Sequence, residues 1–254
     1  MTKVFVRVAI VLATWLTLMP GGIFAGSAPR PLGQTELVAL VAGDTLPENV
    51  ARQIAANGLA FHPDEAYRSF LRNAGADARI LKALDVARVT VTQGTQDRAN
   101  LEVLQHISEA ARLMRAGRDD DAARQLTAAV TASFKSPECG FVMGELLQRE
   151  EDWERAEVMY DAVLNEDPDF REAHTKLSYV LYREGNPEEA LREAKAALAI
   201  TPANAEAHKN AGLALAGLRK FDAAAAEYKE ALRLKPDYKP VKYGLALIIR
   251  EQGE

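Results

Sequence analysis

Residues 171–204 read REAHTKLSYVLYREGNPEEALREAKAALAITPAN, and this stretch decides the fold. Its apolar side chains recur in two runs with the spacing of one helix face: Leu177, Val180 and Leu181, then Ala190, Leu191, Ala194 and Leu198. Gly185 and Asn186 separate the runs, and Pro187 followed by two glutamates is typical of a first helical turn. The stretch therefore predicts two antiparallel helices joined by a short turn.

The same pattern returns along the chain, because Pro168, Pro202 and Pro236 lie 34 residues apart. Aligned on these prolines, small or apolar residues share the same places: Ala156, Ala190 and Ala224; Leu147, Leu181 and Leu215; Gly144, Ser178 and Gly212. The repeat divides the chain into three clear units and a weaker first one: 137–170, 171–204, 205–238 and, before them, 103–136.

A single helix pair cannot bury its apolar face, so successive pairs are expected to stack around one continuous core. The predicted fold class is all-α, an α-solenoid of antiparallel helix pairs. A capping helix over 239–254 would close the stack, with three residues turned inward: Leu245, Ala246 and Ile249. Leu247 and Ile248 would then be exposed, either as an imperfect cap or as a surface for a partner.

This pattern resembles the tetratricopeptide repeat family, closely over 137–238 and weakly over 103–136. One departure is the place where the family often has tryptophan, which here holds His106, Gly140, His174 and His208. The resemblance implies a solenoid of this type whose first helices line a concave groove for a peptide or helix of another protein.

Carried over place by place, the resemblance gives ten groove residues: Phe141, Glu145, Arg149, Lys176, Tyr179, Tyr182, Arg183, Lys209, Asn210 and Leu213. Tyr179 and Tyr182 are the expected anchors, because aromatic side chains beside basic ones are typical of interface hot spots. Lys176 and Lys209 are expected to pair with acids of the partner.

The first 25 residues have the order of a secretory signal peptide. Lys3 and Arg7 precede an apolar run, and Ala25 offers a small residue for cleavage. The uncharged run from Val8 to Met19 would span roughly 18 Å as a helix, short of a membrane core of ~30 Å. We therefore expect a periplasmic or secreted protein with no membrane span after signal removal; an uncleaved N-terminal anchor is the alternative.

Between the signal and the repeats, a flexible leader (26–33) precedes a small helical module of unknown role (34–90), and a polar linker (91–100) follows. Turn signals divide the module into four expected helices: Glu36 to Val41, Glu48 to Asn57, Asp64 to Asn73 and Ala78 to Val89. The first of these is expected to be apolar on one face.

The charge balance and the residue types argue against nucleic-acid binding, metal binding and catalysis. The chain has 31 Lys and Arg against 36 Asp and Glu, a net charge of −5, so it lacks the basic character of a nucleic-acid binder, and no nucleic acid partner is expected. His106, His174 and His208 would line up about 8–10 Å apart on packed helices instead of converging on an ion. We expect no metal, no cofactor and no catalytic residue.

The expected function is thus that of an exported, non-enzymatic module that binds a partner protein or peptide in its groove. The main alternative is a self-associating scaffold or assembly factor for a cell-envelope or secretion complex, acting through Leu247 and Ile248. An enzyme is a weaker alternative, because residues 34–90 contain several acid–base groups: Asp44, Glu48, His62, Asp64 and Glu65.

Overall fold

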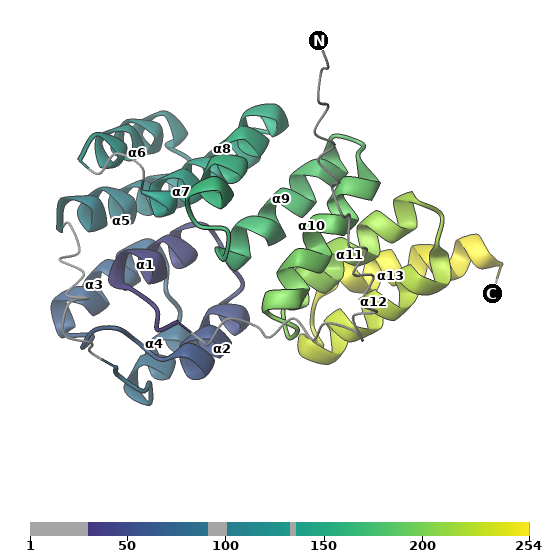
Figure 1. Cartoon of the computed structure of the whole chain (residues 1–254), viewed down its shortest axis with the longest axis horizontal. Helices are drawn as coiled ribbons and strands as arrows, with labels where there is room; N and C mark the ends of the chain where they lie inside the picture. Colours follow the sequence, from purple (N-terminus) through teal and green to yellow (C-terminus); the bar gives the residue numbers. More distant parts are fainter. Residues whose placement is uncertain (1–29, 91–100, 133–135, 254) are drawn as a thin grey trace, which may run out of the picture.

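The computed structural model describes residues 30–90, 101–132 and 136–253, and these ranges hold thirteen helices and no regular strand (Figure 1). The predicted fold class, an all-α solenoid of helix pairs behind a small helical module, is confirmed. The predicted signal peptide (1–25) and linker (91–100) lie outside the described residues, as does the first half of the leader (26–29).

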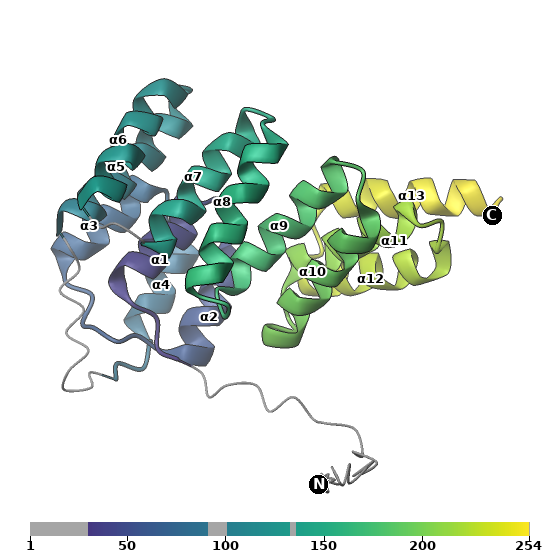
Figure 2. The same ribbon diagram turned by 45° about the horizontal axis from the view of Figure 1, so that its top comes forward.

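Each repeating unit is a hairpin of two helices, and the hairpins lie side by side in both views (Figures 1 and 2). The pairs are α5 (Leu101–Arg115) with α6 (Asp119–Ala132), α7 (Pro137–Arg149) with α8 (Trp153–Glu166), α9 (Arg171–Arg183) with α10 (Pro187–Ile200), and α11 (Ala205–Gly217) with α12 (Phe221–Leu234). The last helix, α13 (Lys239–Gln252), packs against α12 and α11 of the last hairpin.

The turn inside every hairpin uses one residue with a left-handed backbone. The φ angles are 69° at Gly117, 59° at Glu151, 85° at Gly185 and 57° at Arg219. These four positions are the same place in successive units. Glycine adopts this conformation without strain, whereas Glu151 and Arg219 adopt it against the steric preference of their side chains.

Within a hairpin, a small residue on the first helix makes room for a large one on the second. Gly144 faces Tyr160, and a Cβ added at Gly144 would lie only 2.7 Å from the tyrosine ring. Gly212 and Tyr228 repeat this arrangement in the last hairpin. In the hairpin between them the same places hold Ser178, whose hydroxyl donates to the carbonyl of Ala190, and Ala194.

The capping helix α13 turns a different face inward from the one we expected. Val241 and Ile248 are buried at 0% and 3% exposure, whereas Ile249 is 41% exposed. Leu245 packs between them, so the buried face follows the spacing i, i+4 and i+7 from Val241. The prediction that Ile248 is exposed and Ile249 buried was therefore wrong.

The N-terminal module consists of α1 (Gln34–Ala42), α2 (Pro47–Asn57), α3 (Glu65–Ala74) and α4 (Ala78–Asp85). The fourth helix ends before the expected Val89, because Val89 pairs with Leu59 in an isolated parallel bridge, and Leu59 pairs in turn with Leu32. Three short segments far apart in sequence, around Leu32, Leu59 and Val89, thus lie side by side.

Helix α1 is buried on every side, not on one face as we expected. Six consecutive apolar residues, Leu37 to Ala42, are all at most 8% exposed. The helix packs against α2 and α3 of the module and against α5 and α7 of the repeats. The buried residues of the module and those of α5 to α10 consequently form one continuous hydrophobic cluster.

Candidate partner-binding face

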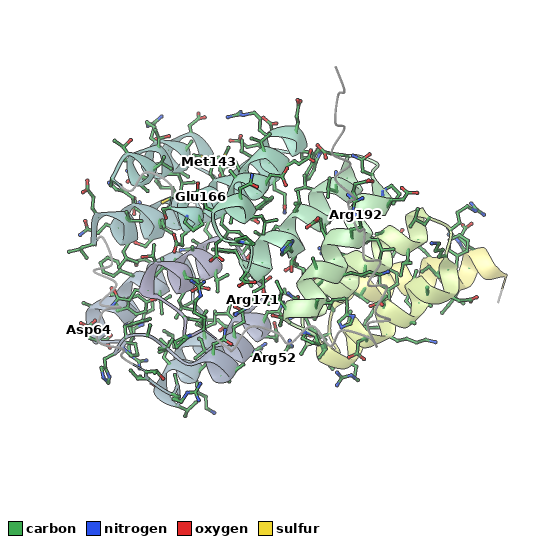
Figure 3. All side chains as sticks on the ribbon, in the orientation of Figure 1. Arg52, Asp64, Met143, Glu166, Arg171 and Arg192 are labelled. Carbon is green, nitrogen blue, oxygen red and sulfur yellow. The ribbon has the colours of Figure 1, made fainter. Side chains whose placement is uncertain are left out.

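The first helices of the units, α5, α7, α9, α11 and α13, form the face on which all ten predicted groove residues were placed. The structure divides this face into two parts. The N-terminal module lies against the first part, and Arg52 and Arg171 mark the junction (Figure 3). There the Arg52 guanidinium donates to the carbonyl of Ala203, and that of Arg171 donates to Gln53 at 3.4 Å.

Four predicted groove residues belong to what we call the covered half: Phe141, Glu145, Lys176 and Asn210, all 0–4% exposed. The Phe141 ring lies directly against Gly43 at the end of α1, so closely that a Cβ added to this glycine would collide with it. The apolar α1 thus fills the place we expected an outside ligand to take. These four side chains are not accessible to another chain, which corrects that expectation for each of them.

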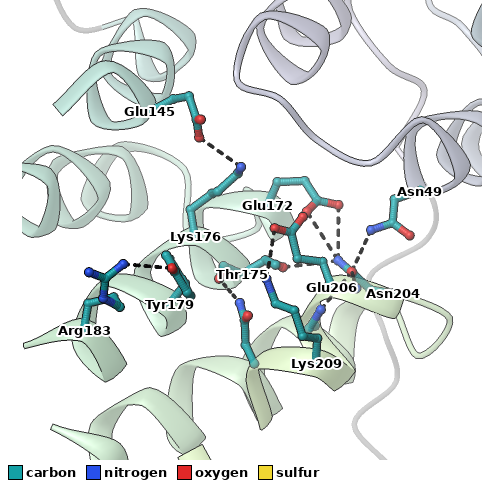
Figure 4. Close-up of polar contacts among 12 residues, drawn as sticks. Asn49, Glu145, Glu172, Thr175, Lys176, Tyr179, Arg183, Asn204, Glu206 and Lys209 are labelled. Atoms are coloured by element: carbon teal, nitrogen blue, oxygen red, sulfur yellow. Dashed lines mark hydrogen bonds and ion pairs between the residues drawn. The ribbon is translucent and has the colours of Figure 1, made fainter. Parts of the chain in front are cut away.

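Lys176 and Glu145 form a buried ion pair at 2.9 Å, and each side chain is 5% exposed (Figure 4). Burial lowers the pKa of Lys176, but the nearby carboxylates of Glu145 and Glu206 outweigh it and raise that pKa well above its usual value. The lysine therefore stays charged and is already paired. This corrects the expectation that it binds an acid of the partner.

A polar seam joins α2 to the beginnings of α9 and α11, with Asn204 at its centre (Figure 4). Asn49 donates to the Asn204 side-chain oxygen at 2.7 Å, and that oxygen also caps the first turn of α11. The Asn204 amide donates to Thr175 at 3.1 Å and to Glu172 at 3.3 Å. Side chains from two distant parts of the sequence thus satisfy one another in the interior.

Glu172 is the buried acid of this seam, with 0% exposure. It accepts a hydrogen bond of 2.7 Å from Gln53 of α2. Burial, together with the charge of Glu206, raises the pKa of Glu172 to about 7, while Lys176 and Arg171 act in the opposite direction. Glu172, which links the repeats to the module through Gln53, therefore changes its protonation near neutral pH.

Asn210, which the sequence placed in the groove, connects two first helices instead. Its amide donates to the carbonyl of Thr175 at 2.7 Å, across from α11 to α9. The prediction did not anticipate this role, because the resemblance supplies a place in the unit and not the partner across the helix interface.

The remaining predicted residues are exposed or half-buried, and we call them the open half: Arg149, Tyr179, Tyr182, Arg183, Lys209 and Leu213. All but Lys209 lie in the second halves of α7, α9 and α11, and none of the six shares a hydrogen bond or an ion pair with the described residues of the module. Tyr182 lies beside the exposed Gly217, whose added Cβ would be 3.7 Å from the ring. Tyr179 lies close to both Arg183 and Lys209, whereas Arg149 donates to the carbonyl of Met114 on α5.

Trp153, at the beginning of α8, joins this group, and we did not predict it. Its ring lies 6.1 Å from that of Tyr179 in an edge-to-face arrangement, and the Arg183 guanidinium lies 4.2 Å from its centre. Trp153 shares its place in the unit with Pro187 and Phe221. That place is on the second helix, where the resemblance predicted no groove residue.

Three histidines at one place in their units act as braces within their hairpins. The Nδ1 atoms of His106, His174 and His208 each lie 2.7 Å from a side-chain oxygen of the second helix: Gln125, Glu193 and Glu227. Gly140 takes the fourth place, opposite Val163 where the other units have alanine. Among the described residues, no group of three His, Cys, Asp or Glu side chains could hold a metal ion.

The acid–base groups of the module make structural contacts. Glu48 is bonded to Lys235 at 2.8 Å and to Arg79, which ties α2 to the end of α12 and to α4. Asp64 caps α3 by accepting from the amide of Tyr67 at 2.8 Å. Glu65 pairs with Arg72 at 2.6 Å, and Asp44 and His62 are exposed on loops. Within the described part of the chain, no hydrogen bond or ion pair joins any two of these five groups.

The helix pairs, their period of 34 residues and their shared turn define an α-solenoid of the tetratricopeptide-repeat type. In sequence, residues 141–205 and 209–254 match the family model described as tetratricopeptide repeat. No match was found among curated proteins.

Solved structures share the fold at low sequence identity. One is titled "MamA 41-end from Desulfovibrio magneticus RS-1", with 24% identity and a TM-score of 0.54; the match covers 60% of this chain and 86% of that one. Another, titled "Functional Characterization of Pseudomonas Aeruginosa pilF", has 19% identity and a TM-score of 0.56, covering 60% of this chain and 70% of that one. At these identities the likeness shows the fold alone.

Proposed function

We propose that the protein is a non-enzymatic interaction module that binds a segment of a partner protein on the open half of its groove. The observation that carries this proposal is that Arg183 is exposed, and Tyr179 and Tyr182 partly so, where the N-terminal module leaves the first helices uncovered. Tyrosine, tryptophan and arginine supply most of the binding energy in typical interfaces. Repeat solenoids of this type offer such concave surfaces for recognition.

In this proposal the partner places an extended or helical segment over the ends of α7, α9 and α11. Tyr179 and Tyr182 are the anchors, and Leu213 adds apolar contact from the neighbouring helix. Tyr243, which is 69% exposed on α13, has the place in its unit that Lys209 has in the preceding one. The module takes part indirectly, because it fills the covered half and confines the segment to the remaining surface.

Site-specific photo-crosslinking in living cells tests the proposal. A crosslinking amino acid at Tyr182 or Leu213 should give a discrete covalent product with a partner protein. The same amino acid at Val158, which is 56% exposed on α8, should not give this product. The variant Tyr179→Ala with Tyr182→Ala should lose the Leu213 product with unchanged helicity by circular dichroism. The proposal fails if neither position crosslinks, or if the Val158 product is the same.

The alternative function is a scaffold that associates with copies of itself through the ends of the solenoid. Exposed apolar side chains favour it, but they are not the pair we expected: Ile249 is 41% exposed on α13, and Leu101 is 56% exposed at the beginning of α5. Light scattering over a range of concentrations tests this alternative. A mass that rises with concentration in the natural protein but not in Ile249→Asp would support self-association.

We further propose that the protein is exported by its N-terminal signal, to the periplasm or to the outside. The order of a basic start, an apolar run and a small residue at Ala25 supports this. Among the described residues, no helix has the length and apolar character needed to cross a membrane. The intact mass of the protein isolated from its natural cells should lack the first 25 residues; the full mass would indicate an uncleaved anchor instead.

A further inference from the structure

Arg183 is held between two aromatic rings of the open half. Its Cζ atom lies 4.2 Å from the centre of the Trp153 ring and 5.8 Å from that of Tyr179. Its Nη1 donates to the Tyr179 hydroxyl at 3.0 Å (Figure 4). Stacking of this kind fixes the plane of the guanidinium, so little side-chain freedom remains to be lost when a ligand binds.

The arginine at the same place in the preceding unit shows what Arg183 lacks. Arg149 donates to the carbonyl of Met114 at 2.9 Å and lies 4.0 Å from Asp119. Arg183 makes neither kind of contact: over the described ranges, its hydrogen-bond acceptor is the Tyr179 hydroxyl and no carboxylate lies within ion-pair distance. A guanidinium has five N–H donors, and most of those of Arg183 have no partner among the residues that the structure describes.

A second cation lies near the same tyrosine. The Nζ atom of Lys209 is 5.0 Å from the centre of the Tyr179 ring and 3.7 Å from Glu206, so it is only loosely paired. Both cations are therefore within 6 Å of one ring centre. Carboxylates lie beside two of the three basic residues of the open half, Asp119 near Arg149 and Glu206 near Lys209, whereas none of the described carboxylates is within ion-pair distance of Arg183.

We infer that the open half receives an acidic segment of another protein, and that Arg183 binds one of its carboxylates with two parallel N–H donors. This inference rests on the proposed function and names the chemistry of the partner. The planar fork of a guanidinium matches the two oxygens of a carboxylate, and such paired hydrogen bonds are strong and directional. Lys209 receives a second acid, and the Tyr179 ring between them contacts an apolar residue of the segment.

The inference can be tested with defined peptides and fluorescence polarisation. The probes are two fluorescein-labelled nonapeptide amides, one with Glu and Leu alternating and one with Gln and Leu alternating. The Glu peptide should bind, with an affinity that falls as salt is added, and the Gln peptide should bind at least tenfold more weakly. No binding of the Glu peptide, or equal affinities of the two peptides, would overturn the inference.

Variants of Arg183 assign the effect to this residue. Arg183→Gln should weaken binding of the Glu peptide at least tenfold, and Arg183→Lys should weaken it as well, because a lysine keeps the charge but not the fork. Arg192→Gln is the matched control: this exposed arginine on α10 already pairs with Glu189 at 3.4 Å, and its loss removes the same charge (Figure 3). Unchanged binding by Arg183→Gln, or equal losses in both Gln variants, would contradict the assignment.

The crosslinking experiment separates this inference from the function on which it rests. If the segment crosslinked at Tyr182 is rich in Asp and Glu and belongs to another protein, both stand. If that segment contains no acidic residue, or belongs to a second copy of this chain, the inference fails while the open half remains a binding surface. If no segment is crosslinked, the proposed function itself fails.

Discussion

Single residues with unusual backbones explain the regularity of the hairpins. Every hairpin turn needs one left-handed residue, and the chain supplies it with Gly117 and Gly185 in two units and with Glu151 and Arg219 in the other two. Nothing lies within 4 Å of the Cβ that a substitution would add at Gly117 or Gly185. The energy at stake is therefore conformational and not steric.

Gly185→Ala should accordingly lower the free energy of unfolding by about 1 kcal/mol, the usual cost of left-handed backbone for a residue with a Cβ. Arg219→Gly should raise it by a similar amount for the same reason. Urea denaturation followed by circular dichroism measures both changes. A stabilising Gly185→Ala would show that the turn relaxes out of the left-handed region.

Glu172 makes stability depend on pH. Its pKa is about 7 in the folded protein, above the ordinary value of 4.5, so the folded state holds a proton that the unfolded state releases. Its contribution is therefore fully present below pH 4.5 and is lost as the pH rises through 7. Between these limits the free energy of unfolding should fall as the pH rises.

Glu172→Gln should remove this component of the pH dependence, because the amide resembles the protonated acid at every pH. The measurement is the urea midpoint at several pH values from 5 to 8. Glu188→Gln, at an exposed position on α10, is the control. Its urea midpoint should change with pH as steeply as that of the natural protein. An unaltered slope in Glu172→Gln would assign the dependence to other groups.

At the scale of elements, the two helices of a hairpin pack closely because a small residue on one helix lies opposite a large residue on the other. A larger side chain in place of Gly144 would strike the Tyr160 ring. Gly144→Ser should therefore cost roughly 1–3 kcal/mol through overpacking. In the background of Tyr160→Ala the same change should cost little, because the pair then resembles Ser178 with Ala194 of the next unit.

A double-mutant cycle on urea denaturation measures this coupling. The expected interaction energy is at least about 1 kcal/mol, which is typical of residues in direct contact. Additive effects would mean that the ring of Tyr160 moves aside without cost.

The helices of the repeats could be predicted closely from sequence, because each unit gives an independent view of the same pattern. α7, α9 and α11 begin at Pro137, Arg171 and Ala205, the first residues of the units that the prolines define. The buried face of α13 could not be predicted in this way, because no second copy of this helix shows which of its residues point inward. Ile248 and Ile249 are adjacent isoleucines, and only the packing decides between them.

The candidate site could be predicted only in part. The position of a residue within its repeat unit indicates whether it faces the groove. This reasoning placed Tyr179, Tyr182 and Arg183 on one surface. It does not tell what else in the chain lies there. The signal for the covered half was local: Leu37 to Ala42 is an unbroken apolar run, which indicates a helix buried all round. Which surface buries that run is a long-range property that one sequence does not reveal.

At the scale of the whole molecule, the module shares one hydrophobic cluster with α5 to α10, whereas most buried apolar residues of α11 to α13 form a second cluster. Leu71 of α3 is fully buried in the same cluster as the repeat residues, and Trp153 packs against that cluster from α8. The chain has two tryptophans, and the other, Trp15, lies in the predicted signal peptide. In a protein prepared without residues 1–25, tryptophan fluorescence therefore reports on Trp153 of the repeats alone.

Leu71→Ala should lower the unfolding midpoint seen by Trp153 fluorescence, with a loss of about 2–5 kcal/mol. The substitution is in the module and the probe is in the repeats, so the shift measures how strongly the two unfold together. A midpoint that stays in place, while helical circular dichroism shows an earlier partial transition, would mean that the module unfolds independently.

The helix α1 also has a consequence for the length of ligand that the protein can accept. A long polypeptide could not lie along the whole groove, because α1 and α2 occupy the covered half. Chain termini, tight bends and strands that cross the curve at a steep angle avoid that obstruction. The shape and size of a polypeptide would therefore decide first whether it can bind, and its individual side chains only afterwards.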